Sequence, residues 1–481
     1  MLMKRLDLAE IEWPNVQPAL LLLTAVLTAG AATVGAQGAE PANPPPSTIL
    51  AGGVPGPAPD GPVTLTLSQA VERGLERNLA VAVGREQANA AAGARKAVRS
   101  RVLPQLDATL AESRNVINLE AYGFPVAPGE SPLIGPFNVF DVRAAVALPV
   151  VDLSGWADAR AASHAAEAAG ATLADLRDQV VLAVSSLYLS ASAADSRVVV
   201  ARAQVATARA LHEQAIDMKA AGVVAAIEVL RSEVQLATER ERLIIAENEA
   251  ATSKLALARA IGLPLDAELV LLEPLEESSA PVIDVDEAVQ RALGQRSDYL
   301  SAQAALAAAK EASNAARNLA IPSLEMEADW GKIGPDVSGA LTTYTVAARF
   351  VLPIYRGGFI HARKITAAAA LAERQARLAD LRARIEFEVR SALLDLAAAG
   401  RRTRVAGDAV RLAESQLEQA RDRFAAGVAD GVEVIQALQT AATANDNEIA
   451  SLLDENLARV RLARALGVAA EELDDRSGGT R

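Results

Sequence analysis

Apolar and polar residues alternate with a period of two in four short segments of the chain. In the clearest of them, Leu324 and Met326 alternate with Glu325 and Glu327. Such a period is typical of β-strands that have one apolar and one polar face. The predicted strands form two pairs and occupy residues 103–114, 137–150, 321–332 and 341–354.

The polar face of these strands carries most of their charge. Its members are Gln105, Asp107, Asp141, Arg143, Glu325, Glu327, Asp329 and Arg349. Strands of roughly ten residues with two such faces suit either a soluble sandwich or a membrane barrel with lipid outside and water inside. A soluble sheet of this size needs a second layer, and the pattern predicts no further strands. We therefore favour the barrel, in which these polar residues line the lumen.

Four strands are too few for one chain to form that barrel alone. An open sheet cannot insert into a bilayer, because every backbone N–H and C=O group needs a partner there. Two copies would supply about eight strands, whose lumen side chains fill, whereas three would supply about twelve and leave room for a pore. We expect a homotrimer that shares one barrel.

The remainder of the chain has the residue spacing of long α-helices. The two longest runs without proline are 153–221 and 358–426, and each would form a helix about 100 Å long. Helices of about half that length return after Gly222 and Gly427. The short helices predicted before the two strand pairs are 68–102 and 286–320. A return helix and a leading helix together match one long helix, so we expect them to stack end to end against it.

The chain contains two copies of this unit of helices and strands. Ala70 matches Ala288 at an offset of 218, and Pro149 matches Pro353 at an offset of 204. Landmarks that are so widely spaced rarely keep register by chance. The drop of 14 residues indicates that the loop between the two strands is shorter in the second copy.

The pattern divides the chain into six segments. Lys4 and Arg5 precede an apolar run that ends in small residues, as in a signal peptide. An uncleaved membrane helix is less favoured, because the run is shorter than the roughly 20 apolar residues that a span needs. The segments are a signal peptide at 1–36, a Pro/Gly-rich linker at 37–64, the first copy at 65–265, a linker at 266–285, the second copy at 286–470 and a polar tail at 471–481.

Composition narrows the classes of partner. Hydrophobic residues make up 51% of the chain and aromatic residues only 3%, which suits close packing of long helices better than an enzyme core. The net charge of −13, with basic residues interleaved among acids, argues against a nucleic-acid partner. The chain has no cysteine, which excludes disulfides, thiolate metal sites and a lipidated N-terminal cysteine.

The residues offer little for catalysis. His164, His212 and His361 stand far apart on predicted helices, without the spacing of a paired metal site. No serine lies in a nucleophile turn, and no glycine-rich loop of phosphate-binding spacing follows a strand. We expect no catalytic residue, no metal and no cofactor.

An ordered set of motifs resembles the outer-membrane efflux proteins, the TolC-like channels, over roughly 65–470. The motifs are LTLSQAVERGLERN, the strand exits ALPVVDLSGWADAR and FVLPIYRGGFIHAR, and the hairpin segments MKAAGVVAAIEVL and RFAAGVADGVEVI. The resemblance implies a mainly α fold, in which long hairpins form a periplasmic tunnel below a trimeric twelve-stranded barrel in the outer membrane. It also implies an exit duct for an inner-membrane pump, joined through a periplasmic adaptor.

The resemblance further implies roles for residues at the two hairpin turns. The residues expected to contact the adaptor are Gly222, Val223, Phe424, Gly427 and Val428. The residues expected to ring the periplasmic entrance are Glu228, Glu433 and Gln436. The last of these replaces a further acid of the family, and Ala429 stands where the best-known members have a basic gate residue. Carboxylates crowded at such an opening favour cations and make its closed state depend on pH and salt.

Two other functions stay open at this point. The same duct could serve protein secretion of type I rather than export of small molecules, which is a difference of partner more than of fold. A periplasmic coiled-coil scaffold without a pore would also use long helices, but it leaves the duplicated amphipathic strands unexplained.

Overall fold

The computed structural model describes residues 52–57, 61–127, 129–277 and 283–468. All of them belong to the second of the two units into which the chain divides, residues 44–481. The predicted signal peptide and polar tail lie outside the described residues. Among the helices that are described, none combines the length and the apolar character needed to cross a bilayer.

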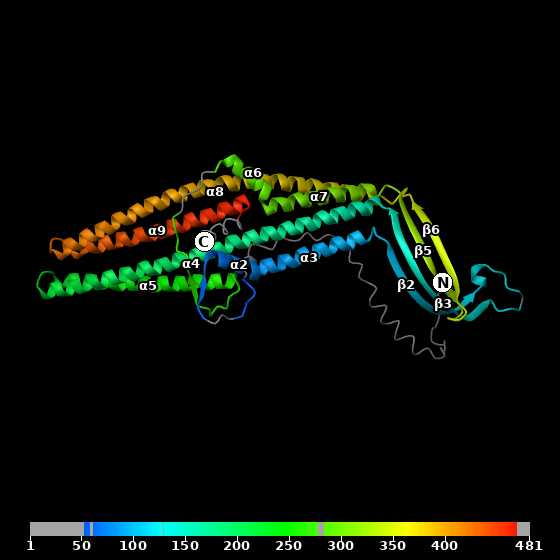
Figure 1. Cartoon of the computed structure of the whole chain (residues 1–481), viewed down its shortest axis with the longest axis horizontal. Coiled ribbons are helices and arrows are strands. Elements are labelled where there is room, and N and C mark those ends of the chain that lie inside the picture. Colours follow the sequence, from blue (N-terminus) through cyan, green and yellow to red (C-terminus); the bar gives the residue numbers. More distant parts are fainter. Residues whose placement is uncertain (1–51, 58–60, 128, 278–282, 469–481) are drawn as a thin grey trace, which may run out of the picture. The chain divides into compact units, whose positions relative to one another are not determined.

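The four predicted strands are confirmed and form one antiparallel sheet. Its order is β2 (Gln105–Asn118), β3 (Leu133–Val151), β5 (Ser323–Gly334) and β6 (Leu341–Val351). The sheet lies at one end of the helices (Figure 1). β2 and β6 are its outer strands, and within the described residues each pairs along one edge only.

The first strand pair extends further than the second. β3 has 19 residues and β6 has 11. β2 and β3 therefore extend beyond the predicted strands 103–114 and 137–150 into the segment between them. The residues that the second copy lacks are thus partly strand. The second pair closes through a tight turn, in which Asp336 accepts a hydrogen bond from Gly339 N–H at 2.7 Å.

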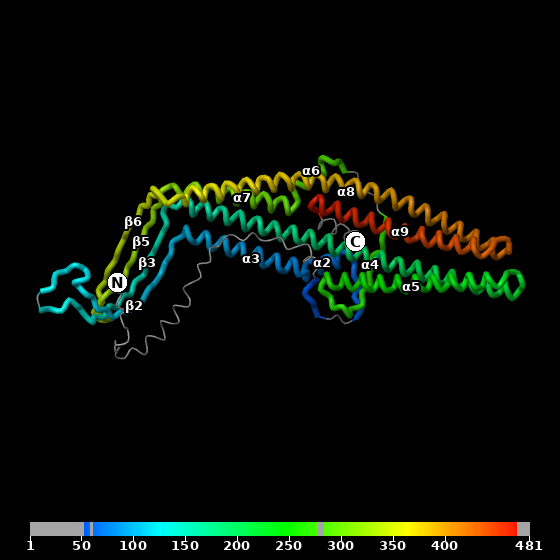
Figure 2. Tube along the Cα trace, turned by 180° about the vertical axis from the view of Figure 1, so that it is seen from behind, coloured from blue at the N-terminus to red at the C-terminus, as the bar shows by residue number. Residues whose placement is uncertain are grey.

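Two helical hairpins make up the length of the described unit. The long helices are α4 (Leu153–Ala220) and α8 (Phe359–Ala425), and the return helices are α5 (Ala226–Ala260) and α9 (Gly431–Leu466). With 68 and 67 residues the long helices are each about 100 Å long, as predicted. Figure 2 shows both hairpin turns at the same end, away from the sheet.

The helices that precede the strand pairs are not continuous, so that prediction is wrong. The first consists of α2 (Leu67–Arg77) and α3 (Leu79–Ser100), and the second of α6 (Val285–Gln295) and α7 (Ser297–Asn318).

The breaks fall at Asn78 and Arg296, where the backbone is extended. Asn78 caps α3 by accepting from Ala80 N–H at 2.9 Å, and its side-chain amide donates to the carbonyl of Ala260 at 3.3 Å. The first break is therefore fixed by the end of α5, which is remote in sequence.

The segments predicted as linkers contribute a second, parallel sheet. It consists of β1 (Val63–Leu65) and β4 (Leu269–Leu271). The hydroxyl of Tyr188 on α4 donates to the carbonyl of Leu65 at 3.1 Å and accepts from Glu273 N–H at 3.2 Å. These contacts fasten Leu65 of β1, and Glu273 just after β4, to the long helix. The prediction of linkers is wrong at residues 63–64 and 269–271, which are strand.

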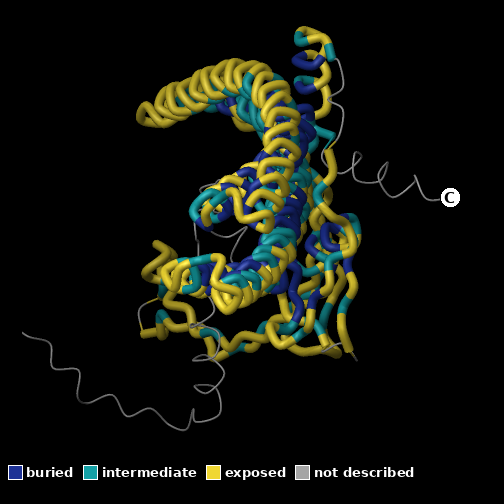
Figure 3. Tube along the Cα trace, turned by 90° about the vertical axis from the view of Figure 1, so that its left-hand side faces the viewer, coloured by how far each residue is buried: buried dark blue, intermediate teal, exposed yellow. Residues whose placement is uncertain are grey.

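Each copy has its own apolar core, where its short helices meet its long hairpin. In the first copy Tyr188, Leu257 and Ile261 are buried there, and in the second copy Ile385 and Leu462. Alanine makes up much of the remaining buried surface. Most positions of the two long helices are not buried, and the end-on view shows buried positions on only part of each helix (Figure 3). The buried stripe is thus narrow, as expected for helices that pack through small side chains.

Candidate functional site

The strand register places all eight predicted lumen residues on one face of the sheet. Asp107 pairs with Ala145, Ala145 with Asp329, and Asp329 with Thr345, so these four lie in one row across the strands. Because side chains alternate along a strand, residues at even spacing from this row share its face. The members are Gln105, Asp107, Asp141, Arg143, Glu325, Glu327, Asp329 and Arg349.

Two arginines on this polar face pair with carboxylates. Arg143 on β3 contacts Asp141 at 2.8 Å and Asp329 on β5 at 2.9 Å. Arg349 on β6 reaches Glu327 at 3.5 Å. Five carboxylates thus face two guanidinium groups, and the face keeps a negative charge. Such a surface suits a wall that borders water and attracts cations.

The opposite face of the sheet is apolar and exposed. Leu106, Val146, Ala328 and Val346 form one row of it. The row that begins at Ala108 contains the cross-strand pair of Trp330, 62% exposed, and Tyr344, 76% exposed. Water-soluble surfaces rarely carry a continuous apolar patch of this extent, whereas a face in lipid requires it.

The two hairpin turns share one backbone motif. At the first turn Gly222 has a φ of 77°, and Val223 N–H donates to the carbonyl of Met218 at 2.8 Å. At the second, Gly427 has a φ of 73° and Val428 N–H donates to Arg423 at 3.0 Å. A left-handed residue after the last helical turn is the usual position of glycine, which has no Cβ to clash. Both valines are exposed at the tips.

Glu228 links the two hairpins. It lies in the first turn of α5 and its Oε2 atom accepts a hydrogen bond from Gly431 N–H, at the start of α9, at 3.2 Å. Its Oε1 atom pairs with Arg231 at 2.5 Å, and the side chain is only 12% exposed. The positive end of a helix dipole favours a carboxylate at this position. Glu228 is therefore a bound carboxylate rather than a free one.

Glu433 occupies the matching position on the second hairpin but has a different environment. Asp430 caps α9 by accepting from Glu433 N–H at 3.2 Å. The Glu433 carboxylate pairs with Arg423 at 3.0 Å, and its side chain is 43% exposed. Gln436 is exposed one helical turn further along. The side chains of Glu433 and Gln436 are thus accessible to solvent, whereas that of Glu228 is not.

Phe424 is buried, which contradicts a direct contact with a partner protein. Its side chain is 1% exposed and packs with Leu211 of the first hairpin and Val434 of the second. Three residues before the turn, a helical position faces the neighbouring hairpin rather than the tip. Phe424 thus positions the two turns relative to each other.

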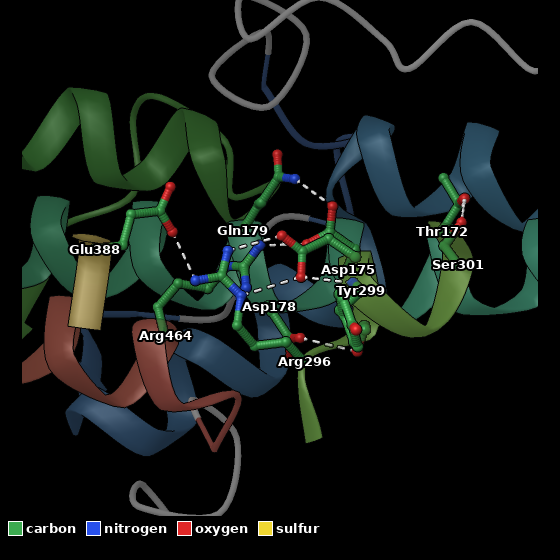
Figure 4. Close-up of polar contacts among 11 residues, drawn as sticks. Thr172, Asp175, Asp178, Gln179, Arg296, Tyr299, Ser301, Glu388 and Arg464 are labelled. Atoms are coloured by element: carbon green, nitrogen blue, oxygen red, sulfur yellow. Dashed lines mark hydrogen bonds and ion pairs between the residues drawn. The ribbon is translucent and has the colours of Figure 1, made fainter. Parts of the chain in front are cut away.

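A cluster of charged residues, which the sequence patterns did not predict, joins four helices (Figure 4). Arg296, at the break between α6 and α7, pairs with Asp298 at 2.7 Å and with Glu388 on α8 at 2.6 Å. Arg464 on α9 pairs with Asp175 on α4. The cluster also contains the hydrogen bonds of Ser297 to Asp178 and of Gln179 to Asp175.

The pKa values of the buried aspartates in this cluster shift in different directions. Desolvation raises the pKa of Asp175, although Arg464 opposes the shift, and it raises the pKa of Asp178 in the same way. Burial also disfavours ionised Asp298, but the hydrogen bond and charge of Arg296 outweigh it and lower the pKa of Asp298. We interpret the cluster as a structural junction that joins these helices.

The histidines show no metal-binding geometry. His164 contacts Glu167 at 2.9 Å and His212 contacts Ser232 at 3.0 Å. In the described ranges no three His, Asp or Glu side chains converge as metal ligands would.

A family model described as outer membrane efflux protein matches residues 70–263 and 288–468 of this chain. The two matches correspond to the two copies. Among characterised proteins, the pyoverdine export outer membrane protein OpmQ of Pseudomonas aeruginosa is 25% identical over 382 residues, which are 76% of this chain and 77% of that protein.

Solved structures of outer-membrane channels share this fold. The channel OprN superimposes with a TM-score of 0.73 at 18% identity, covering 84% of this chain and 90% of that one. The channel CmeC of Campylobacter jejuni gives a TM-score of 0.72 at 16% identity, covering 86% and 89%. The open state of MtrE of Neisseria gonorrhoeae gives 0.70 at 18% identity, covering 84% and 89%.

Proposed function

The chain belongs to the outer membrane efflux protein family, and we propose that three copies form one exit duct, which an inner-membrane pump loads through a periplasmic adaptor. The protein is an outer-membrane channel of the efflux type. The proposal comprises the trimer, the adaptor contact, the gate and the cargo.

One observation carries this function: a sheet with an exposed apolar face and a charged polar face, at the end of hairpins about 100 Å long. Leu106 and Val346 represent the apolar face, and Asp107 and Glu325 the polar one. A scaffold in water would gain nothing from the apolar face, whereas a barrel wall needs both faces.

The open edges of the sheet support assembly. β2 and β6 each present an unpaired edge within the described residues, and in a bilayer those backbone groups must be paired. Pairing β6 of one copy with β2 of the next satisfies both edges at once. Three copies give about twelve strands, the smallest number of copies that leaves an open lumen.

The tips of the hairpins are the surface that we assign to the adaptor. Val223 and Val428 are exposed there on two turns with the same backbone motif, held at fixed positions by Gly222 and Gly427. Phe424 is buried behind the tips and takes no part in that contact. Its packing holds the two turns in fixed positions relative to each other.

We assign gating of the periplasmic entrance to the acids beside the tips. The hydrogen bond from Gly431 to Glu228 ties the second hairpin to the first, so a movement of α8 and α9 away from α4 and α5 must break it. Glu433 and Gln436 are the accessible polar side chains at the entrance, and Arg423 holds the carboxylate of Glu433 in place.

Small molecules are the proposed cargo. OpmQ is named for the export of pyoverdine, and the duct of this chain would present a negatively charged polar wall in its barrel. No catalytic role is proposed, since the family consists of channels. The alternative is protein secretion, and the experiment must distinguish it from the export of small molecules.

The test uses the full-length protein and a strain that lacks it. Purification in detergent should give a trimer, and reconstitution into a planar bilayer should give an ion current. The deletion strain should accumulate toxic small molecules, and its pattern of secreted proteins should stay unchanged. A monomer without current refutes the duct, and loss of one secreted protein without sensitisation shows that the cargo is polypeptide.

A further inference from the structure

The ion pair between Asp175 and Arg464 joins the two copies of the repeat within one chain. Asp175 lies on α4 of the first copy and Arg464 on α9 of the second. Both side chains are largely buried, 8% and 13% exposed, where α4 packs against α7 and α9. We call this surface between α4 and the helices of the second copy the seam.

Both halves of this ion pair recur in the other copy. The sequence LADLR occurs at 173–177 and again at 378–382, an offset of 205 that takes Asp175 to Asp380. The sequence LARA occurs at 257–260 and again at 462–465, which takes Arg464 back to Arg259. The duplication therefore supplies a second aspartate on α8 and a second arginine on α5.

The two aspartates have the same local partner at the same position. Gln179 donates to Oδ2 of Asp175 at 2.7 Å, and Arg384, at the matching position, donates to Oδ2 of Asp380 at 2.6 Å. Oδ1 of Asp175 is taken by Arg464. Among the residues that the structure describes, Arg384 alone pairs with Asp380, whose side chain is 68% exposed.

Two pairs of apolar residues at the same offset of 205 on these helices also differ in exposure between the copies. Leu189 on α4 is 5% exposed, whereas its equivalent on α8, Leu394, is 71% exposed. Ile449 on α9 is 6% exposed, whereas its equivalent on α5, Ile244, is 67% exposed. In each pair one residue is buried and its equivalent in the other copy is exposed. A large apolar side chain left in water at the matching position indicates a partner that a single chain does not provide.

We propose that the seam repeats between subunits, so that Asp380 of one copy pairs with Arg259 of the neighbouring copy. Within the described residues α8 packs mainly on α6, α7 and α9, and the first-copy equivalents of α7 and α9 are α3 and α5. A second copy of this chain offers α3 and α5 to α8, with an arginine opposite Asp380 and Ile244 on the same helix. The tunnel then alternates seams within chains and seams between chains. This inference rests on the proposed trimer and adds the register of its helices.

Charge reversal tests the pair in the full-length trimer. Asp380→Arg and Arg259→Asp should each lower the temperature at which the trimer dissociates in detergent, and the double variant should recover most of that loss. Asp408→Arg is the matched control. Asp408 is an equally exposed aspartate on α8 with a partner, Arg411, on its own helix, but its first-copy equivalent is an alanine. It should leave the dissociation temperature unchanged.

Cross-linking is a second measurement, and its result does not depend on small changes in the stability of the trimer. The chain has no cysteine, so Asp380→Cys with Arg259→Cys introduces two thiols per chain and no others. A bifunctional maleimide should join subunits only when both substitutions are present. A trimer in which reversal is not rescued and the two thiols do not link overturns the pair and leaves the proposed function intact. A wild-type chain that is monomeric overturns both.

Discussion

The carboxylate of Glu228 accepts a hydrogen bond from the backbone N–H of Gly431 at 3.2 Å, across 203 residues of sequence. It is a contact between the tips of the two hairpins, and it uses the positive end of the α9 dipole. The contact gives the proposed gate a physical form, because the hairpins cannot separate at the tip without breaking it.

Removal of the Glu228 side chain should open the resting channel. Glu228→Ala leaves Gly431 N–H without its acceptor, so the closed arrangement loses a charge-assisted hydrogen bond of about 1.5–3 kcal/mol. Single-channel recording should show a higher resting conductance, and cells should admit large antibiotics more readily. Glu233→Ala, an exposed acid on the same helix, is the control. Equal conductance of the two variants would remove Glu228 from the gate.

Gly431→Ala should give the same effect although the acid at position 228 is retained. A Cβ atom at Gly431 would clash with Oε2 of Glu228, so the carboxylate must move away. Gly407→Ala, where the nearest atom is Glu448 Oε1 at 3.5 Å, is an ordinary contact and should be silent. The comparison separates the hydrogen bond from the mere presence of an acid. A silent Gly431→Ala together with an active Glu228→Ala would mean that charge alone matters.

The two faces of the sheet should respond oppositely to arginine. Val346 lies on the apolar face and Thr345, its neighbour on β6, on the polar face. Val346→Arg puts a charge into lipid at roughly 2–4 kcal/mol per chain near the midplane and should block assembly in the membrane. Thr345→Arg should be tolerated. Heat-resistant trimers in outer-membrane fractions report the outcome, and normal insertion of Val346→Arg would refute the assignment of faces.

The strands and the long hairpins could be predicted because their signal is local. Alternation at Leu324 to Glu327 and helical spacing without proline need no knowledge of the rest of the chain. The breaks at Asn78 and Arg296 could not be predicted in that way. Asn78 is held by the carbonyl of Ala260, and Arg296 by Glu388, and both partners are remote in sequence. The strands β1 and β4 were not predicted for the same reason. Each has only three residues, and its partner strand is distant in sequence.

The sequence predicted the positions of the candidate site residues but not the contacts that they make. The repeated spacing after Gly222 and Gly427 located Glu228 and Glu433. Their different environments follow from the packing of one hairpin on the other, which brings Gly431 to Glu228 and Arg423 to Glu433.

The buried acids at the helix junction should make stability depend on pH. Asp175 and Asp178 have raised pKa values, so the folded chain binds protons more tightly than the unfolded chain. Their contribution to the free energy of unfolding is fully present below the ordinary aspartate pKa and is lost as pH rises through the raised values. Asp298, whose pKa is lowered, acts oppositely, and its contribution is lost as pH falls through its own pKa.

Asp178→Asn should therefore flatten the decline in stability above about pH 4, the ordinary aspartate range. Asp298→Asn should flatten the decline below it. Thermal unfolding in detergent across that range measures both, with exposed Asp408→Asn as control. Parallel curves for the wild type and Asp178→Asn would contradict the role of this buried acid.

The charge of the polar face should set the ion preference of the barrel. Arg143 and Arg349 offset Asp141, Asp329 and Glu327 through ion pairs, whereas Asp107 and Glu325 form no ion pair within the described residues. These last two charges lie outside the ion pairs, so we expect each of them to add to the negative potential in the lumen.

Asp107→Asn combined with Glu325→Gln should reduce the preference for cations, seen as a smaller reversal potential in a salt gradient. The double variant removes six charges from a trimer without disturbing an ion pair, so assembly should be unaffected. Glu120→Gln, in the 3-10 helix between β2 and β3, changes charge outside the sheet and is the control. Because salt screens these charges, the difference should shrink as ionic strength rises. A reversal potential equal to that of the wild type at low salt would mean that this face of the sheet does not line the conducting path.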